Sequence, residues 1–202
     1  MELEFRKFEK IARLKRDMII TEKIDGTNGQ IVIQQTSAID SNYLPITEQY
    51  GMEVGEYTML AGSRKRYITP EVDNYGFARW VSENREGLLW LGEGRHYGEW
   101  WGSGIQRRYD MDKKVFSLFN VHRWDTDNIP GDILRVVPVL YRGPFSTEEI
   151  DFALADLAIN GSQAAPEFMH PEGVVVYMVQ ARTLFKVTIK DDGIPKSLIK
   201  EK

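Results

Sequence analysis

The chain has 202 residues, a formal net charge of −4 and no cysteine. This length predicts one domain, or at most two small ones, and is enough to form a hydrophobic core. The lack of cysteine excludes disulfides, Cys-ligated metals and thiol nucleophiles, and it agrees with the reducing cytoplasm, where we expect the protein. The negative net charge argues against a protein that coats nucleic acid through overall basic charge. The apolar run at 174–179 is far too short to cross a membrane, so we expect no membrane partner.

The first half of the chain predicts short strands around polar turns. In chain order we expect a short helix at 8–16, strands at 18–21 and 29–34, a loop at 36–51 and a strand at 54–61. Apolar residues at helical spacing then predict a helix at 75–91.

Strands also predominate in the second half. We expect strands at 97–101, 115–121 and 134–141, and later at 173–179 and 184–189. Between them, Ser146 and Glu149 have the spacing of a capping box, which predicts a helix start at this point. Many turns are too short to hold a crossover helix. The pattern therefore favours a largely antiparallel α+β fold over a doubly wound parallel one.

A lysine followed by a glycine-containing turn is the sharpest feature of the sequence. Residues 22–28 read EKIDGTN, so Lys23 stands at the end of a predicted strand, just before the turn. Lysine can act as a nucleophile when its amine is neutral. Taken alone, this short pattern is more typical of a solvated surface turn than of a reactive lysine.

Four later segments accompany the lysine segment in a fixed order. They are YGE at 97–99, FSLFN at 116–120, PEGVVV at 171–176 and FKVTIK at 185–190. In order and residue type, the five segments resemble the motifs of the covalent nucleotidyltransferases: DNA ligases, RNA ligases and mRNA capping enzymes. With Asn28 at its end, the first motif is similar to that of the double-strand-sealing RNA ligases. Ser63-Arg64 resembles the short arginine motif that follows the first motif in the family.

The resemblance implies a ligase-type catalytic domain of the α+β class. Such a domain has two mainly antiparallel sheets around a nucleotide cleft, with flanking helices. It implies ATP as the nucleotide, Mg²⁺ or Mn²⁺ as the metal, and a covalent bond between AMP and Lys23. The implied catalytic residues are Lys23, Lys186 and Lys190; the implied nucleotide-binding residues are Glu22, Ile24, Asn28, Arg64, Glu99, Phe119, Glu172 and Lys186; and the implied metal ligands are Glu172 and Glu99.

The chemistry of these side chains agrees with the implied roles. Carboxylate oxygens of Glu99 and Glu172 suit Mg²⁺ or a ribose hydroxyl, and Phe119 offers an aromatic face to a base. Lys186 and Lys190 supply cations for the α-phosphate. Each residue also has an ordinary alternative: Glu99 as an exposed edge-strand residue, Glu172 as the start of a strand, Phe119 as a core residue and Arg64 as a solvated loop cation.

The last segment departs from the family pattern. Its lysines are four residues apart, whereas the family usually has Lys-x-Lys. Strand alternation would place Lys186, Thr188 and Lys190 on one face. Which lysine contacts the α-phosphate stays open at the level of sequence. The glycine-rich basic segment 102–108 could hold a phosphate or serve as a flexible connector, and we leave it out of the site.

From these observations we predict an ATP-dependent RNA ligase that joins RNA ends, including nicks in a duplex, or DNA ends. We expect residues 1–202 to form a single nucleotidyltransferase domain, with no OB or helical C-terminal domain. The alternatives with the same chemistry are an ATP-dependent DNA ligase and a capping-type guanylyltransferase. An alternative of another class is a nucleic-acid-binding module that keeps the fold without catalysis. The strandedness of the substrate and the oligomeric state stay open.

Overall fold

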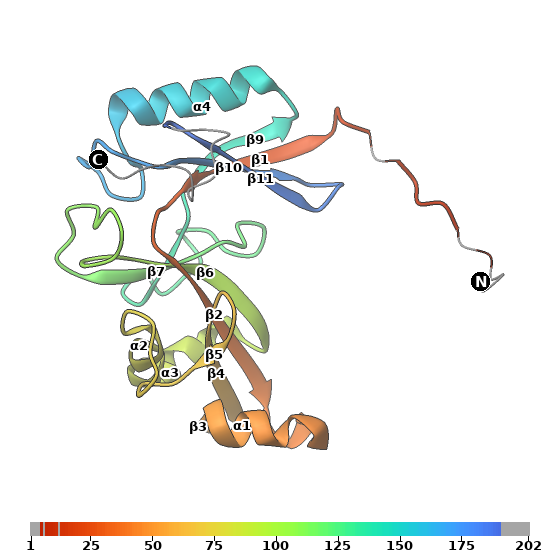
Figure 1. Ribbon diagram of the computed structural model, residues 1–202, viewed down its shortest axis with the longest axis vertical. Helices are drawn as coiled ribbons and strands as arrows, with labels where there is room; N and C mark the ends of the chain where they lie inside the picture. The colour runs from red at the N-terminus through yellow and green to blue at the C-terminus, as the bar shows by residue number, and fades with distance from the viewer. Residues whose placement is uncertain (1–4, 6, 12, 191–202) are drawn as a thin grey trace.

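The computed structural model describes residues 5, 7–11 and 13–190. Its strands form two sheets, a smaller one with the order β11-β10-β1-β9 and a larger one with the order β3-β4-β2-β6-β7-β8, to which β5 is added beside β4. Figure 1 shows the smaller sheet at the top and the larger sheet below it. Among the described strands only β7 and β8 pair in parallel, so the expected α+β, mainly antiparallel fold is confirmed.

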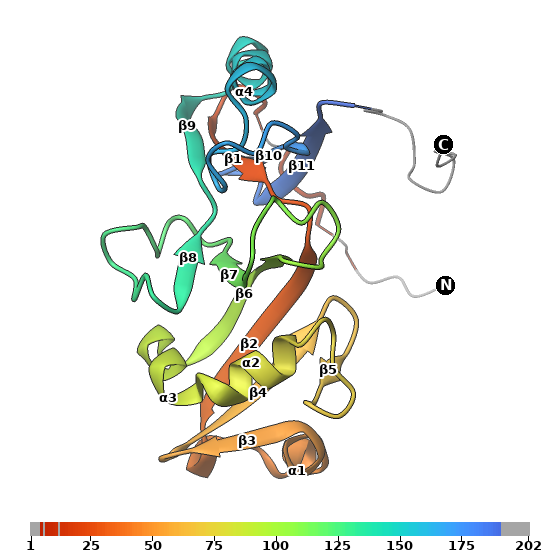
Figure 2. The same cartoon turned by 90° about the vertical axis from the view of Figure 1, so that its left-hand side faces the viewer.

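The smaller sheet carries a helix on one of its faces. Its strands are β1 (Asp17–Lys23), β9 (Val139–Pro144), β10 (Gly173–Met178) and β11 (Thr183–Thr188). Alternate residues such as Met18 and Val176 are buried against Leu157 of helix α4 (Thr147–Asn160). The hydroxyl of Ser146 accepts a hydrogen bond from the amide of Glu149, so the predicted helix start is confirmed. Figures 1 and 2 show α4 lying across this face.

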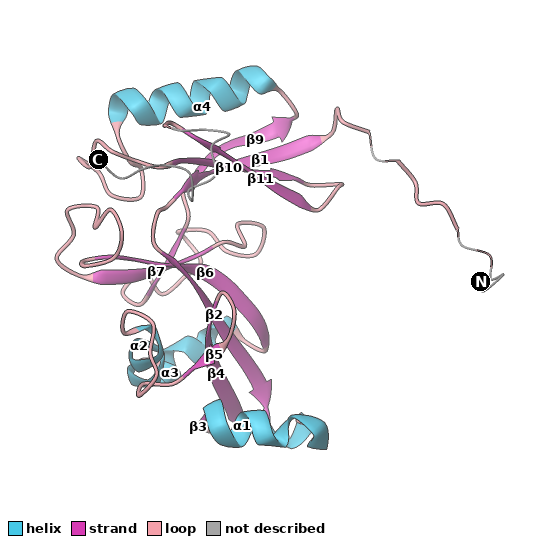
Figure 3. Ribbon diagram, viewed as in Figure 1, coloured by secondary structure: helices cyan, strands magenta, loops and turns pink. Residues whose placement is uncertain are grey.

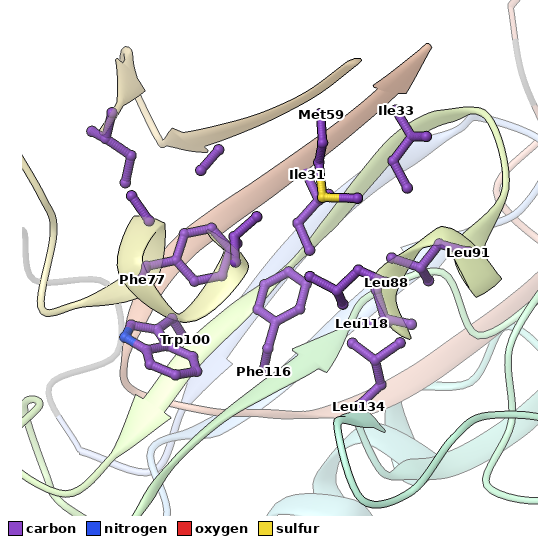
Figure 4. Close-up of a cluster of buried hydrophobic side chains, with 14 of the residues drawn as sticks. Ile31, Ile33, Met59, Phe77, Leu88, Leu91, Trp100, Phe116, Leu118 and Leu134 are labelled. Atoms are coloured by element: carbon purple, nitrogen blue, oxygen red, sulfur yellow. The ribbon is translucent and has the colours of Figure 1, made fainter. Parts of the chain in front are cut away.

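The larger sheet packs the apolar side chains of one face against short helices. Its strands are β2 (Thr27–Gln35), β3 (Gly51–Val54), β4 (Tyr57–Ser63), β5 (Tyr67–Ile68), β6 (Gly94–Gly102), β7 (Lys114–Leu118) and β8 (Leu134–Val136). Helices α2 (Phe77–Glu83) and α3 (Arg85–Leu88) and the 3-10 turn η3 (Leu89–Leu91) cover one face. There the ring centroid of Phe77 lies 5.0 Å from that of Phe116 and 5.5 Å from that of Trp100 (Figure 4).

Between residues 13 and 190, the chain crosses from one sheet to the other twice. The first is the turn at 24–26, between β1 and β2. The second, residues 137–138, leads from β8 in the larger sheet to β9 in the smaller one. The single strand expected at 134–141 is therefore two strands in different sheets. Pro138 lies at the break, where a residue without an amide hydrogen cannot continue a ladder.

Four other predictions are corrected by the local structure, as the colouring in Figure 3 shows for helices and strands. The described residues of 8–16 contain no helix. The segment expected as a loop at 36–51 contains α1 (Leu44–Tyr50), which has proline in its first turn. The strand expected at 54–61 is present from Tyr57 onward as β4, whereas Val54 ends β3 and the chain turns between the two strands at Gly55, which has a positive φ of 58°. The helix expected at 75–91 is divided into α2, α3 and η3.

In the described part of the chain, no helix combines the length and the apolar character that a membrane crossing requires.

Candidate active site

A cavity of about 1090 Å³ lies where the two sheets meet. The smaller sheet contributes the face opposite α4, with Thr21, Val175 and Lys186 side by side in the register of β1, β10 and β11. The cavity is lined by every predicted site residue except Lys190, namely Glu22, Lys23, Ile24, Asn28, Arg64, Glu99, Phe119, Glu172 and Lys186. Segments that are distant in the sequence are therefore brought to one place.

Lys23 ends β1 at the wall of this cavity. Its amine lies 2.5 Å from a carboxylate oxygen of Glu172. The Glu172 side chain is 3% exposed and the Lys23 side chain 21% exposed, so the carboxylate is withdrawn from solvent while the amine keeps access to the cavity. Antiparallel pairing of Lys23 with Gly173 explains this contact, because it sets Glu172 beside the end of β1.

Glycines allow the segments around Lys23 to approach closely. A Cβ atom on Gly173 would lie 2.2 Å from the carbonyl oxygen of Val187, and Gly173 has a positive φ of 151°. A Cβ atom on Gly26 would lie 2.5 Å from the carbonyl oxygen of Trp100. A side chain at either position would push the neighbouring backbone away. Glycine is therefore required in the turn after Lys23 and at the position on β10 that pairs with Lys23.

Glu99 holds the turn that follows Lys23. One carboxylate oxygen accepts a hydrogen bond from the amide of Gly26, and the other accepts one from the side-chain amide of Asn28, both at 3.0 Å. Burial raises the pKa of Glu99 to about 7, although the Gly26 hydrogen bond and the charge of Lys23 act in the opposite direction. A carboxyl group with this pKa changes its charge in the neutral pH range.

The carboxylate of Glu22 is engaged away from Lys23. It accepts hydrogen bonds from the Ser162 hydroxyl at 2.5 Å and from the amides of Gln163 and Ala164 at 2.9 Å. Burial raises its pKa, and these hydrogen bonds oppose the rise. Since both oxygens bind the 162–164 segment, a contact between Glu22 and a nucleotide would come from its main chain.

The segment 102–111 has a structural role at the site that the sequence did not reveal. Arg107 donates one hydrogen bond to the Asp25 carboxylate at 3.1 Å and another to the carbonyl of His170 at 2.8 Å. The Tyr109 hydroxyl accepts a hydrogen bond from the amide of Asp25 at 2.8 Å. Arg107 thus connects the turn after Lys23 with the segment before Glu172. The glycines at 102 and 104 suggested a flexible connector, and no local pattern indicated these contacts.

This segment also has an unusual backbone. Four of its non-glycine residues have positive φ values between 44° and 60°, namely Gln106, Arg108, Tyr109 and Asp110. Such conformations are costly and persist where surrounding contacts hold them. The buried ring of Tyr109, in edge contact with Trp101 at 4.9 Å between centroids, is one such contact.

The two C-terminal lysines occupy different places. Lys186 lies within β11 and lines the cavity. The strand ends at Thr188, so the alternation expected to continue to Lys190 stops before that residue. Phe119 lines the cavity and is 40% exposed, which separates it from the buried core phenylalanines.

Within the described ranges, no group of three or more His, Asp or Glu side chains is arranged to hold a metal ion alone. Glu99 and Glu172 nevertheless supply two buried carboxylates to the same cavity. This set suits Mg²⁺, which proteins usually bind through one or two carboxylates together with substrate phosphates.

Two mainly antiparallel sheets enclose a cavity with a lysine at the end of a strand, which agrees with the expected covalent nucleotidyltransferase fold. The model of the RNA ligase family matches residues 16–188, and the chain therefore belongs to the RNA ligase family. No curated protein matches the chain.

Solved structures with a similar fold include those of an RNA ligase from Naegleria gruberi. A variant with ATP and manganese is 16% identical with a TM-score of 0.55, and the match covers 87% of this chain and 50% of that one. The same ligase with pyrophosphate is 17% identical with a TM-score of 0.53, covering 86% and 49%. A variant with AMP and manganese is 15% identical with a TM-score of 0.54, covering 87% and 50%. The chain thus spans about half the length of these structures.

Proposed function

We propose that the protein is an ATP-dependent RNA ligase in which Lys23 becomes adenylylated. The observation that carries this proposal is the position of the Lys23 amine, 2.5 Å from the buried Glu172 carboxylate, at the wall of a large cavity. Arg64 and Lys186 line the same cavity and could bind phosphates, while the exposed ring of Phe119 could contact a base.

The proposed reaction has three steps. The neutral amine of Lys23 attacks the α-phosphorus of ATP, a phosphorus–nitrogen bond forms, and pyrophosphate leaves. A 5′-phosphate oxygen of the RNA then attacks the same phosphorus and releases the lysine. Finally, the 3′-hydroxyl of the other RNA end attacks the activated 5′-phosphate, the phosphodiester bond forms, and AMP leaves. Lys186 is proposed to stabilise the charge that develops on the α-phosphate, and the role of Lys190 stays a prediction.

Glu172 and Glu99 are proposed to hold Mg²⁺ or Mn²⁺ together with the phosphates. The ion would neutralise charge on the triphosphate. The presence of ATP and manganese in a structure of the Naegleria gruberi ligase supports this choice of nucleotide and metal. That residues 1–202 form a single nucleotidyltransferase domain also stays a prediction.

Incubation with α-labelled ATP or GTP, followed by a denaturing gel, tests the proposal. We expect covalent label from ATP with a divalent metal ion. Label from GTP instead would favour a capping-type guanylyltransferase. No label from either nucleotide would favour a non-catalytic nucleic-acid-binding module. Sealing assays on RNA, DNA and mixed substrates would then separate an RNA ligase from a DNA ligase.

A further inference from the structure

The larger sheet has a second face, opposite its hydrophobic core, that carries polar and aromatic side chains. Tyr97 on β6 pairs with Gln30 on β2, Gln30 pairs with Gly62 on β4, and Gly62 pairs with Tyr67 on β5. Directly paired residues point to the same face of an antiparallel sheet. These four residues therefore form one row across four strands, with a tyrosine at each end.

Arg95 joins the members of this row. It lies two residues before Tyr97 on β6, and so it shares the same face. Its guanidinium donates hydrogen bonds to the Gln30 side-chain oxygen at 3.1 Å and to the Tyr67 hydroxyl at 3.2 Å. Across the described ranges, ion pairs with carboxylates are formed by Lys23 and Arg107 and not by Arg95. Its positive charge is thus positioned by neutral groups and remains able to attract an anion. We call Gln30, Tyr67, Arg95 and Tyr97 the platform.

The platform is continuous with the candidate active site. Gln30, Arg95 and Tyr97 line the same cavity as Lys23, and Tyr97 is 52% exposed. The pair formed by Asn28 and Glu99 lies two residues further along the same two strands. Two residues of a strand correspond to about 7 Å, so the platform lies about 7 Å along the strands from the Asn28–Glu99 pair beside the turn that follows Lys23.

We propose that the platform binds unpaired nucleotides of the RNA end that enters the active site. This inference rests on the proposed ligase function and narrows its substrate to single-stranded ends. An exposed aromatic ring beside a positioned arginine suits a base that stacks and a phosphate that is neutralised. In a duplex the bases are stacked inside the helix, and proteins contact its phosphates and 2′-hydroxyls instead. A tyrosine platform would then have no base to receive.

Direct binding of two labelled RNAs tests this surface. One is a 5′-phosphorylated single strand, and the other is the same strand fully paired with its complement. Tyr97→Ala should weaken binding of the single strand by roughly 5- to 150-fold, the range expected from loss of one stacked base, and should leave duplex binding unchanged. Tyr97→Phe keeps the ring and should bind normally. Phe152→Ala serves as the matched control, because Phe152 is an exposed aromatic on α4 with 71% exposure.

The contribution of Arg95 is tested through salt dependence. Arg95→Gln should lower the slope of log affinity against log salt concentration for the single strand by about 0.7, the value for one phosphate contact. Equal losses on single strand and duplex, or no loss in either variant, would overturn the inference. Covalent labelling of the unaltered protein by ATP is measured in parallel. If ATP labels the protein but the platform variants bind RNA normally, the ligase proposal stands and the platform proposal is wrong. If ATP does not label the protein, the ligase proposal itself is wrong.

Discussion

Lys23 stands at the end of β1, where the chain leaves the smaller sheet and turns into the larger one. Its amine is held by a carboxylate that belongs to a segment 149 residues away. The strand that places the Lys23 amine and the carboxylate that contacts it therefore come from distant parts of the chain. Two predictions distinguish the role of the Lys23 amine in adduct formation from the roles of the two C-terminal lysines, Lys186 and Lys190.

Lys23→Ala should abolish formation of the covalent AMP adduct, because it removes the amine that we propose as nucleophile. Lys23→Arg should be equally inactive, since a guanidinium group stays protonated in proteins and is not a nucleophile. Labelling with α-labelled ATP measures both variants. Lys113→Ala, on an exposed residue away from the cavity lining, is the control and should label normally. A denaturation-resistant adduct in either Lys23 variant would contradict the proposed mechanism.

Lys186→Ala should slow adduct formation by about 10²- to 10³-fold, the usual cost of removing a group that stabilises developing phosphoryl charge. Lys190→Ala should slow it less, because Lys190 lies beyond the end of β11 and outside the cavity lining. Single-turnover rates of adduct formation compare the two variants. If the larger loss falls on Lys190→Ala, then Lys190 and not Lys186 contacts the α-phosphate.

At the scale of elements, the strained segment 102–111 connects the two halves of the site. Arg107 contacts both the turn after Lys23 and the segment before Glu172. It does not line the cavity, so we regard it as a positioning residue.

Arg107→Ala should slow adduct formation by about 10- to 100-fold, because small displacements of reacting groups are costly. The KM for ATP should change little, since Arg107 does not reach the cavity. Arg107→Lys should recover part of the rate, as one amine can replace only one of the two contacts. Melting temperature is measured alongside. A raised KM with an unchanged rate, or a rate loss that follows lost stability alone, would argue against a positioning role.

At the scale of the whole molecule, the buried glutamates couple folding to pH. Glu99 has a pKa of about 7 in the folded protein, compared with the ordinary value of 4.5. Its contribution to stability is therefore fully present below pH 4.5 and is lost as the pH rises through 7. The difference between these pKa values corresponds to about 3 kcal/mol.

Glu99→Gln should remove this part of the pH dependence, because an amide does not ionise. The stability of the unaltered protein relative to the variant should fall by up to about 3 kcal/mol between pH 4.5 and pH 7.5. Urea unfolding of both proteins at several pH values, without nucleotide or metal, measures the difference. Glu22 has a raised pKa as well and is present in both proteins, so its effect cancels in the comparison. A difference that is constant with pH would mean that Glu99 ionises normally.

Features that depend on neighbouring residues could be predicted from the sequence. The start of α4 follows from Ser146 and Glu149, which interact within one turn of helix. The strands around Lys23, Glu99, Glu172 and Lys186 follow from short-range alternation and turn residues, and the order of these segments indicated the family. Each segment is a few consecutive residues long, and the order of the segments is read directly along the chain, so no knowledge of distant contacts is needed to find them.

Features that depend on the pairing of distant segments were decided by the tertiary structure. The division of 134–141 between two sheets, the contact of Arg107 with Asp25 across 82 positions, and the engagement of Glu22 by the 162–164 segment have no local pattern. The row from Tyr97 to Tyr67 likewise exists only through the registers of β6, β2, β4 and β5. Register is set by which strands meet and by how their apolar faces are buried together, and this is a property of the whole fold.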